Sequence, residues 1–118
     1  MNAMADTTAE RIARNDAAFR AANEQIRDRA EEHGQPGRIP FLCECAREDC
    51  TEIVWLTPQA YEEIRASPRC FFNAPGHDRH GGDAVEVVRE EEAYVVVQKR
   101  GRAGEIVEEL DPRKEDRQ

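Results

Sequence analysis

Aromatic residues are scarce in this chain of 118 residues, of which they make up only 6%. Hydrophobic residues of all kinds reach 39%, so the apolar surface available for burial is modest against a chain-ordering cost of about 1–2 kcal/mol per residue. The length leaves room for a single domain with one core. A metal ion or a partner is therefore expected to help hold the fold together.

Long apolar runs are missing too. No segment provides the about 20 apolar residues that cross a bilayer, and the N-terminal sequence MNAMADTTAERIARND has neither the apolar stretch nor the cleavage site of a signal peptide. We therefore expect no membrane association and a cytoplasmic location. In that reducing compartment, the four cysteines are better candidates for metal ligands or reactive thiols than for disulfides.

Positive charge is in the minority, with 17 basic residues against 25 acidic ones and a net charge of -8. A chain with this charge repels phosphate backbones, so we do not expect nucleic acid as a ligand. The basic residues are interleaved with glutamate and aspartate and form no basic stripe. A protein is the partner class that remains.

Catalytic motifs are also missing. Ser67 is the only serine and precedes Pro68, no G-x-S-x-G or glycine-rich phosphate loop occurs, and no pair of carboxylates stands out. We therefore predict that the chain is not an enzyme.

Residues 7–32 are predicted to form one long helix, because alanine, glutamate, arginine and glutamine dominate and no glycine or proline occurs before Gly34. Ile12, Phe19 and Ile26 recur every seventh residue, but the heptad positions between them are small, polar or charged, so the apolar stripe is thin. Such a helix needs a surface to lie on. We expect it to cover the domain's own sheet, and the alternative is that it pairs with a second copy of the chain.

Four strands and a short helix are expected after the helix. The strands are predicted at residues 39–45, 52–56, 85–88 and 94–97. Apolar and β-branched residues gather in these segments, and the last two form an antiparallel hairpin. Thr57 and Pro58 open a helix that reaches Ala66, since threonine caps a helix N-terminus and proline fits its first position.

The signals near the C-terminus are weaker. Gly101 and Gly104 are expected to break the chain, and a short segment around Ile106 and Val107 is expected to dock on the core. The charged segment that follows is expected to be mobile.

Three of the four cysteines fall within eight residues, in the C-x-C-x4-C pattern of Cys43, Cys45 and Cys50. On a strand, Cys43 and Cys45 point to the same face, and a turn at residues 46–49 brings Cys50 beside them. Three thiolates at one point repel one another unless a cation holds them, and zinc prefers four tetrahedral sulfur and nitrogen ligands. The spacing predicts a zinc site, with a redox-active thiol cluster or structurally idle cysteines as the alternatives.

The fourth ligand must come from elsewhere, and the residues alone leave Cys70, His77 and His80 as candidates. Cys70 lies among apolar residues, which favours a buried, inert thiol. His77 follows Pro75 and Gly76, a rigid and then a permissive residue that can aim its imidazole inward. His80 precedes two glycines and is expected at a loop tip.

Three motifs extend this pattern: CEC-x4-C-T-E, L-T-x2-x-Y-E-x-I-R-A-x-P, and F-x-x-A-P-G-H followed by an acid. In them the chain resembles an uncharacterised family of small bacterial proteins, found mostly in high-GC Gram-positive lineages, and the resemblance covers most of the chain. The metal ligands that it implies are Cys43, Cys45, Cys50 and His77. The position of Cys70 is usually not cysteine in that family. Ala46 stands where the family often has glycine, and the loop after His80 is longer, but neither departure touches a ligand.

Together these patterns predict an α+β fold, a small zinc-stabilised domain with antiparallel strands, one short helix and a long N-terminal helix. The expected division is an N-terminal helix at residues 1–33, a zinc-binding α+β domain at 34–110 and a charged tail at 111–118. A Cys3His shell has no open position for water or substrate, so the zinc is expected to be structural.

For function we expect a zinc-stabilised protein-interaction or regulatory module, either a monomer or a helix-mediated homodimer. A thiol-based redox or stress sensor is the first alternative, since oxidation of bound thiolates ejects the metal. A metal-dependent hydrolase comes last, because its candidate general bases, Glu44 and Glu52, are expected to be surface carboxylates.

Overall fold

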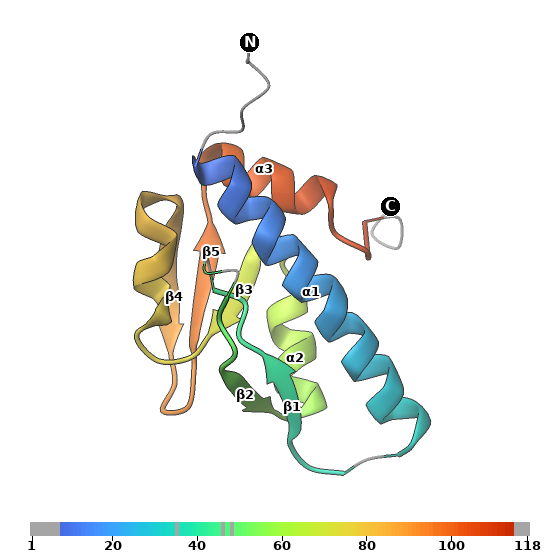
Figure 1. Cartoon of the computed structure of the whole chain (residues 1–118). Coiled ribbons are helices and arrows are strands. Elements are labelled where there is room, and N and C mark those ends of the chain that lie inside the picture. The colour runs from blue at the N-terminus through green and yellow to red at the C-terminus, as the bar shows by residue number, and fades with distance from the viewer. Residues whose placement is uncertain (1–7, 35, 46, 48, 115–118) are drawn as a thin grey trace.

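The protein combines a long N-terminal helix with two small antiparallel sheets, as Figure 1 shows. The computed structural model describes residues 8–114 except 35, 46 and 48. The elements in chain order are α1 (Thr8–Glu32), β1 (Ile39–Leu42), β2 (Ile53–Leu56), α2 (Pro58–Arg65), β3 (Cys70–Asn73), the 3-10 helix η2 (His77–Ala84), β4 (Val85–Glu90), β5 (Val95–Lys99) and α3 (Gly101–Glu109). The α+β fold class expected from the sequence is confirmed.

Helix α1 ends where the sequence predicts. No glycine or proline interrupts it before Gly34, whose left-handed φ of 62° lets the chain turn away. The amide of His33 donates to the carbonyl oxygen of Arg29 at 3.1 Å and closes the last turn. The predicted first residue, Thr7, lies outside the described residues.

The face of α1 that packs on the rest of the fold consists of alanines and of polar or charged residues. Its buried residues are Ala13, Asp16, Ala17, Arg20, Asn23 and Ala30. Arg20 is satisfied in the interior because its guanidinium donates to the carbonyl oxygens of Pro68 at 2.7 Å and Val107 at 2.6 Å. The apolar heptad stripe that begins at Ile12 is only half-buried. Helix α1 therefore packs on its own domain mainly through these buried residues, and the stripe lies at the edge of the contact, where Ile26 packs against the first core cluster.

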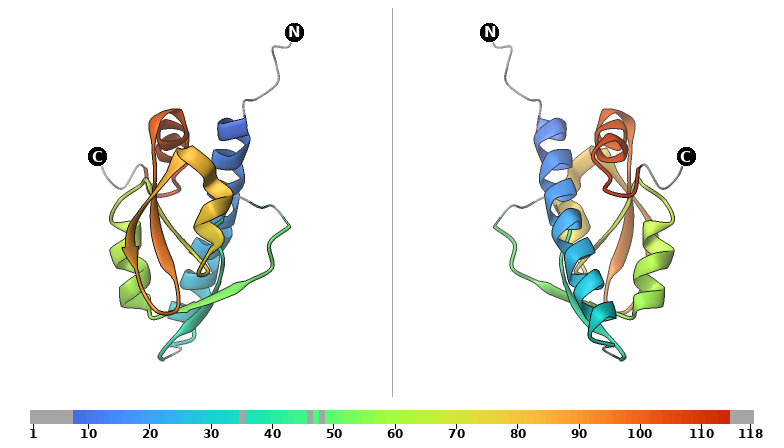
Figure 2. Two further views of the ribbon diagram at one scale, coloured as in Figure 1. Left: turned by 90° about the vertical axis from the view of Figure 1, so that its left-hand side faces the viewer. Right: turned by 90° about the vertical axis from the view of Figure 1, so that its right-hand side faces the viewer.

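Strands β1 and β2 form a two-stranded sheet, and β3, β5 and β4 form a three-stranded sheet in that order. All pairs are antiparallel, with Leu42 opposite Ile53 in the first sheet and Phe71 opposite Val97 in the second. Helices α1 and α2 lie on opposite sides of the strands (Figure 2). The predicted β4–β5 hairpin is confirmed, β1 ends at Leu42 rather than at residue 45, and β3 has no counterpart among the predicted strands.

Helix α2 begins as predicted. Thr57 caps it by accepting a hydrogen bond from the amide of Ala60 at 3.1 Å, and Pro58 occupies its first position. Tyr61 of this helix stacks on Phe41 of β1, with the ring centroids 4.5 Å apart. The stacked rings fix α2 against the hairpin.

Helix α3 occupies the segment in which Gly101 and Gly104 are predicted to break the chain, so that prediction is wrong. Gly101 begins the helix with a φ of 57°, which suits glycine. At Gly104, a Cβ atom would lie 2.6 Å from Nη1 of Arg69 and 2.9 Å from the carbonyl oxygen of Lys99. Both glycines thus allow the helix to start and to pack closely.

Two residues of the expected charged tail, Asp111 and Arg113, lie against the folded domain. Asp111 is buried and accepts a hydrogen bond from Nη2 of Arg65 at 2.5 Å. Burial alone would raise the pKa of Asp111, but the bond from Arg65, the bond from the amide of Arg113 and the positive charges of Arg20 and Arg65 together outweigh it and lower the pKa to about 2. Arg113 pairs with Glu24 at 2.6 Å and with Glu62 at 2.8 Å. Residues 115–118 lie outside the described residues.

The core consists of two buried clusters that meet at β3. The first joins the β1–β2 hairpin, α2 and Phe72, and the second joins α3, β5 and Phe71. Neighbouring residues of a strand point to opposite faces, so β3 serves both clusters. No helix in the described part of the chain is long and apolar enough to cross a membrane.

Candidate metal centre

Three cysteines meet in the loop between β1 and β2. Cys43 follows β1, and its amide donates to the carbonyl oxygen of Glu52 at 3.0 Å, so the ladder continues past the strand. Cys45 lies two residues farther on, and both side chains are only 1% exposed. The amide of Cys50 closes a tight turn that sets its thiol beside the other two. Two residues of the turn expected at 46–49 lie outside the described residues.

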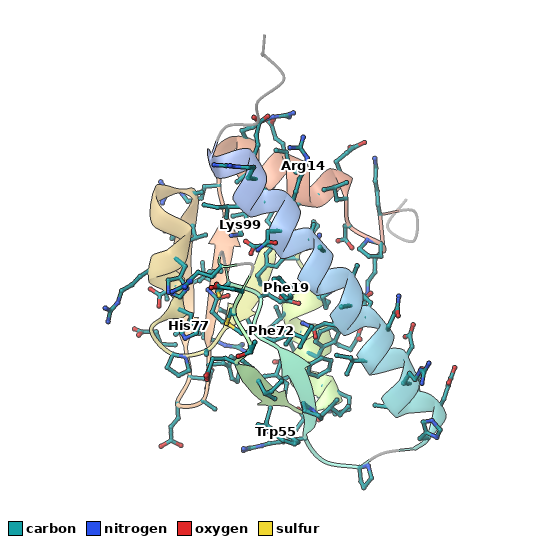
Figure 3. The ribbon with its side chains drawn as sticks, in the orientation of Figure 1. Arg14, Phe19, Trp55, Phe72, His77 and Lys99 are labelled. Atoms are coloured by element: carbon teal, nitrogen blue, oxygen red, sulfur yellow. The ribbon has the colours of Figure 1, made fainter. Side chains whose placement is uncertain are left out.

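The imidazole of His77 reaches this group from the first residue of η2, directly after the connection from β3. Gly76 has a φ of 87°, a left-handed conformation that favours glycine, and the amide of His77 donates to the carbonyl oxygen of Ala74 at 3.0 Å. This turn aims the ring at the cysteines, in line with the expectation from Pro75 and Gly76. Figure 3 shows His77 beside the sulfur atoms.

The four side chains converge on one point. The ligand atoms of Cys43, Cys45, Cys50 and His77 all lie within 4.8 Å of one another. Nδ1 of His77 is 3.6 Å from Sγ of Cys43 and 3.6 Å from Sγ of Cys50. Zinc binds sulfur at about 2.3 Å and imidazole nitrogen at about 2.0 Å, which at tetrahedral angles separates a sulfur from a nitrogen ligand by about 3.5 Å. The geometry therefore fits a metal ion held by three sulfurs and one nitrogen.

Burial and backbone amides act on the thiols in opposite directions. Burial raises the pKa of both Cys43 and Cys45, and the negative charge of Cys50 raises it further. The amide of Ala74 donates to Sγ of Cys43 at 3.2 Å, and the amide of Arg47 bonds to Cys45, and both contacts favour the thiolate. Three thiolates coexist here only if a cation offsets the burial and their mutual repulsion.

Glu44, between the first two cysteines, ties the metal loop (residues 43–50) to α1 and β3. Its carboxylate is only 1% exposed and accepts hydrogen bonds from Nδ2 of Asn23 at 2.8 Å and from the amide of Phe72 at 3.3 Å. Asn23 also bonds to both backbone polar groups of Leu42, at 2.9 Å each. Burial raises the pKa of Glu44 to about 7, although the bond from Asn23 lowers it. The expectation that Glu44 is a surface carboxylate is wrong.

The other two candidate ligands lie outside the cluster. Cys70 begins β3 and is half-buried, and its sulfur is not among the converging atoms. His80 lies in η2 with its ring centroid 4.9 Å from that of His77. Together with Cys50, His77 and Glu52, it lines a hollow of about 280 Å³. The residue expected at a loop tip therefore belongs to a 3-10 helix that borders the site.

The supporting roles of Asn23 and Glu44 are not predicted from the sequence, in which Glu44 is expected only as a surface carboxylate. A signal for Asn23 exists, because asparagine inside a helix is unfavourable unless its side chain has a partner. No comparable signal exists for Glu44, since glutamate is almost never fully buried. Only the path of the metal loop between α1 and β3 shows that its carboxylate lies inside.

No protein-family model matches the chain, and the comparisons with curated proteins and with solved structures find no match either. The resemblance to a bacterial family therefore remains a prediction. The role of the site follows from its own donor atoms and from the elements that they join.

Proposed function

We propose that this chain is a zinc-stabilised protein-interaction or regulatory module of the cytoplasm, without catalytic activity of its own. The observation that carries the proposal is the convergence of three sulfurs and one imidazole nitrogen within 4.8 Å. The donors come from the β1–β2 loop and from the first residue of η2. A bound ion thus links the two sheets at one point.

Zinc is the ion that this donor set suits best. Thiolate and imidazole ligands select zinc over magnesium and calcium, which prefer oxygen. Tetrahedral Cys3His sites are a common form of structural zinc site. The amides of Ala74 and Arg47 support the thiolates, as hydrogen bonds around metal ligands generally orient and tune them.

A structural role is proposed for the ion because four protein ligands fill its tetrahedral shell. A catalytic zinc keeps one position for water or substrate. The nearby Glu44 carboxylate is engaged by Asn23 and Phe72, and Glu52 is exposed at the hollow beside Cys50. We therefore assign no catalytic role to either glutamate.

Metal analysis of the purified chain and three variants tests the proposal. The wild type and Cys70→Ser are expected to carry one zinc per chain, whereas Cys45→Ser and His77→Ala are expected to lose it, because each removes one of the four ligands. Plasma mass spectrometry and native mass spectrometry give the stoichiometry. Cys70→Ser is the matched control, since it removes a thiol that lies outside the cluster.

Zinc retained by both ligand variants, or a wild type without zinc, would contradict the proposal. The redox-sensor alternative draws support from the half-buried Cys50, which borders the hollow beside the site. The same zinc measurement during a peroxide titration decides it, because a site that keeps its metal throughout is not a sensor.

A further inference from the structure

Helix α1 leaves its apolar heptad stripe partly open. Ile12, Phe19 and Ile26 are half-buried, although they are the largest apolar side chains of the helix. The fully buried face beside them consists of small and polar residues. A stripe with seven-residue spacing on a helix of 25 residues is the pattern with which two helices pack side by side.

A hollow of about 470 Å³ adjoins this stripe, between the C-terminal half of α1 and β1. Its apolar walls include Ala22, Ile26, Ile39 and Pro40. Beyond Pro40, its cross-strand neighbour Trp55 is 52% exposed on the hairpin (Figure 3). An apolar hollow that continues into an exposed tryptophan is typical of a protein interface.

We propose that this face binds a second copy of the chain, with the two α1 helices antiparallel and Phe19 of each copy packed against Ile26 and into the hollow of the other. The inference rests on the proposed function, of which it names the partner. A two-fold interface needs one surface that carries both a projecting group and the cavity that receives it. Here the half-buried Phe19 lies on the helix whose next turns line the hollow.

Charge complementarity supports this register. In antiparallel helices, a step of seven residues toward the N-terminus of one copy is a step of seven toward the C-terminus of the other. Pairing Phe19 with Ile26 therefore brings Ile12 opposite His33, one residue past the end of the second helix, and places Arg11 within two residues of Glu32 along the helix axis. Both Arg11 and Glu32 are exposed, and neither forms an ion pair within the described residues. The dimer gains two such pairs, one at each end of the contact.

Sedimentation equilibrium of the full chain tests the contact. Phe19→Ser is expected to raise the dissociation constant of the dimer by about 30-fold or more, which is the loss typical of a buried aromatic anchor. Val88→Ser is the control, because it removes an apolar side chain that is exposed on β4 rather than on α1 and is expected to leave the constant unchanged.

Charge reversal separates the proposed register from other helix pairings. Arg11→Glu places two acidic groups together at each end, so the dimer is expected to weaken several-fold. Adding Glu32→Arg to that variant is expected to restore the wild-type dissociation constant. General damage to the fold does not produce such a rescue.

A wild-type chain that stays monomeric at about 1 mM overturns the inference, and so does a dimer that neither Phe19→Ser nor Arg11→Glu weakens. Zinc content and circular dichroism are measured on the same samples. A folded monomer with one zinc per chain rejects the dimer and leaves the zinc-stabilised fold standing. A folded dimer without zinc supports the helix contact and rejects the zinc-stabilised fold.

Discussion

Two charged side chains, Asp16 of α1 and Lys99 of β5, form an ion pair in the interior. Asp16 is fully buried and Lys99 is only 2% exposed. The Lys99 ammonium and the Arg20 guanidinium also lie over the ring of Phe71, at 5.6 and 4.4 Å from its centroid. Burial raises the pKa of Asp16 to about 6, although Lys99 and Arg20 lower it. Desolvation of the carboxylate therefore outweighs the attraction within the pair.

Removing one partner should cost more than removing both. Lys99→Met is expected to lower the free energy of unfolding by about 3–5 kcal/mol, because it leaves the buried Asp16 carboxylate without its ion-pair partner. The double variant Asp16→Leu with Lys99→Met is expected to recover that loss, since an apolar pair avoids the desolvation of both charges. Urea denaturation of the wild type, the two single variants and the double variant at saturating zinc gives the four free energies of unfolding that make up a double-mutant cycle.

The pH dependence of this cycle has a defined sign. Between the ordinary aspartate pKa of about 3.9 and the value of about 6 in the fold, the folded wild type holds a proton that the unfolded chain has lost. The stability that Asp16 contributes is therefore present at low pH and is lost as the pH rises through about 6. Relative to the double variant, the wild type should be more stable near pH 5 than near pH 7. An equal difference at both pH values would count against this account of Asp16.

Among the elements, α3 depends on a glycine at an interior position. Replacing an interior helix glycine by alanine usually stabilises by about 1 kcal/mol. At Gly104 the new Cβ would lie 2.6 Å from Nη1 of Arg69, which can swing aside, and 2.9 Å from the backbone oxygen of Lys99, which belongs to β5. We expect Gly104→Ala to lower Tm by about 4 °C or more in calorimetry. The exposed neighbour Glu105→Ala should change Tm far less, and a higher Tm for Gly104→Ala would disprove the close approach.

Helices α1 and α2 could be predicted from the sequence because their signals are local. Gly34 ends the first helix, and Thr57 with Pro58 begins the second. These signals act within a few residues and do not depend on tertiary contacts. The β4–β5 hairpin follows in the same way from two runs of β-branched residues. These are the elements that the sequence places within a few residues.

Strand β3 and helix α3 could not be predicted because their signals are tertiary. Phe71, Phe72 and Asn73 are all buried, so β3 lacks the alternation of a strand with one wet face. Gly104 resembles a chain break until the packing of α3 against Lys99 is known. The buried face of α1 escaped prediction for a related reason, since hydrophobic periodicity cannot anticipate a buried Arg20 that bonds to distant carbonyl groups.

In the candidate site, too, the part with a local sequence signal could be predicted and the part that depends on tertiary contacts could not. The C-x-C-x4-C spacing points to three sulfurs of one loop, and the structure brings them together. The fourth ligand depends on a distant connection, so the residues alone leave Cys70 and His80 beside His77 as candidates. Non-local contacts such as that of Nδ1 of His77 with Sγ of Cys43 decide between them.

On the scale of the whole molecule, the metal loop lies where the two sheets meet. The amide of Glu44 donates to the carbonyl oxygen of Phe72 at 3.0 Å, and Cys43 and Cys45 belong to the first buried cluster. The second cluster begins with Phe71 on the other face of β3. Because both clusters include residues of β3 and α1, loss of order in the metal loop is expected to destabilise both clusters.

Removal of the metal is therefore expected to unfold the whole domain in one transition. A structural zinc site contributes about 10–16 kcal/mol near neutral pH, whereas a small domain has a net stability of about 5–15 kcal/mol. Without the ion, the free energy of unfolding should fall to about zero or below. Circular dichroism and hydrogen exchange in excess chelator, followed by return of zinc, measure the loss and its reversal.

The amides of α3 are the most informative probe in that experiment, because α3 packs in the second cluster and not in the metal loop. If the ion holds one cooperative unit, these amides lose protection together with those of Cys43 and Glu44 when zinc is removed. The Cys70→Ser variant, treated in parallel, should behave as the wild type does. Protection that persists in α3 of the metal-free chain would mean that the second cluster folds alone. The ion would then stabilise only the half of the molecule that contains the hairpin.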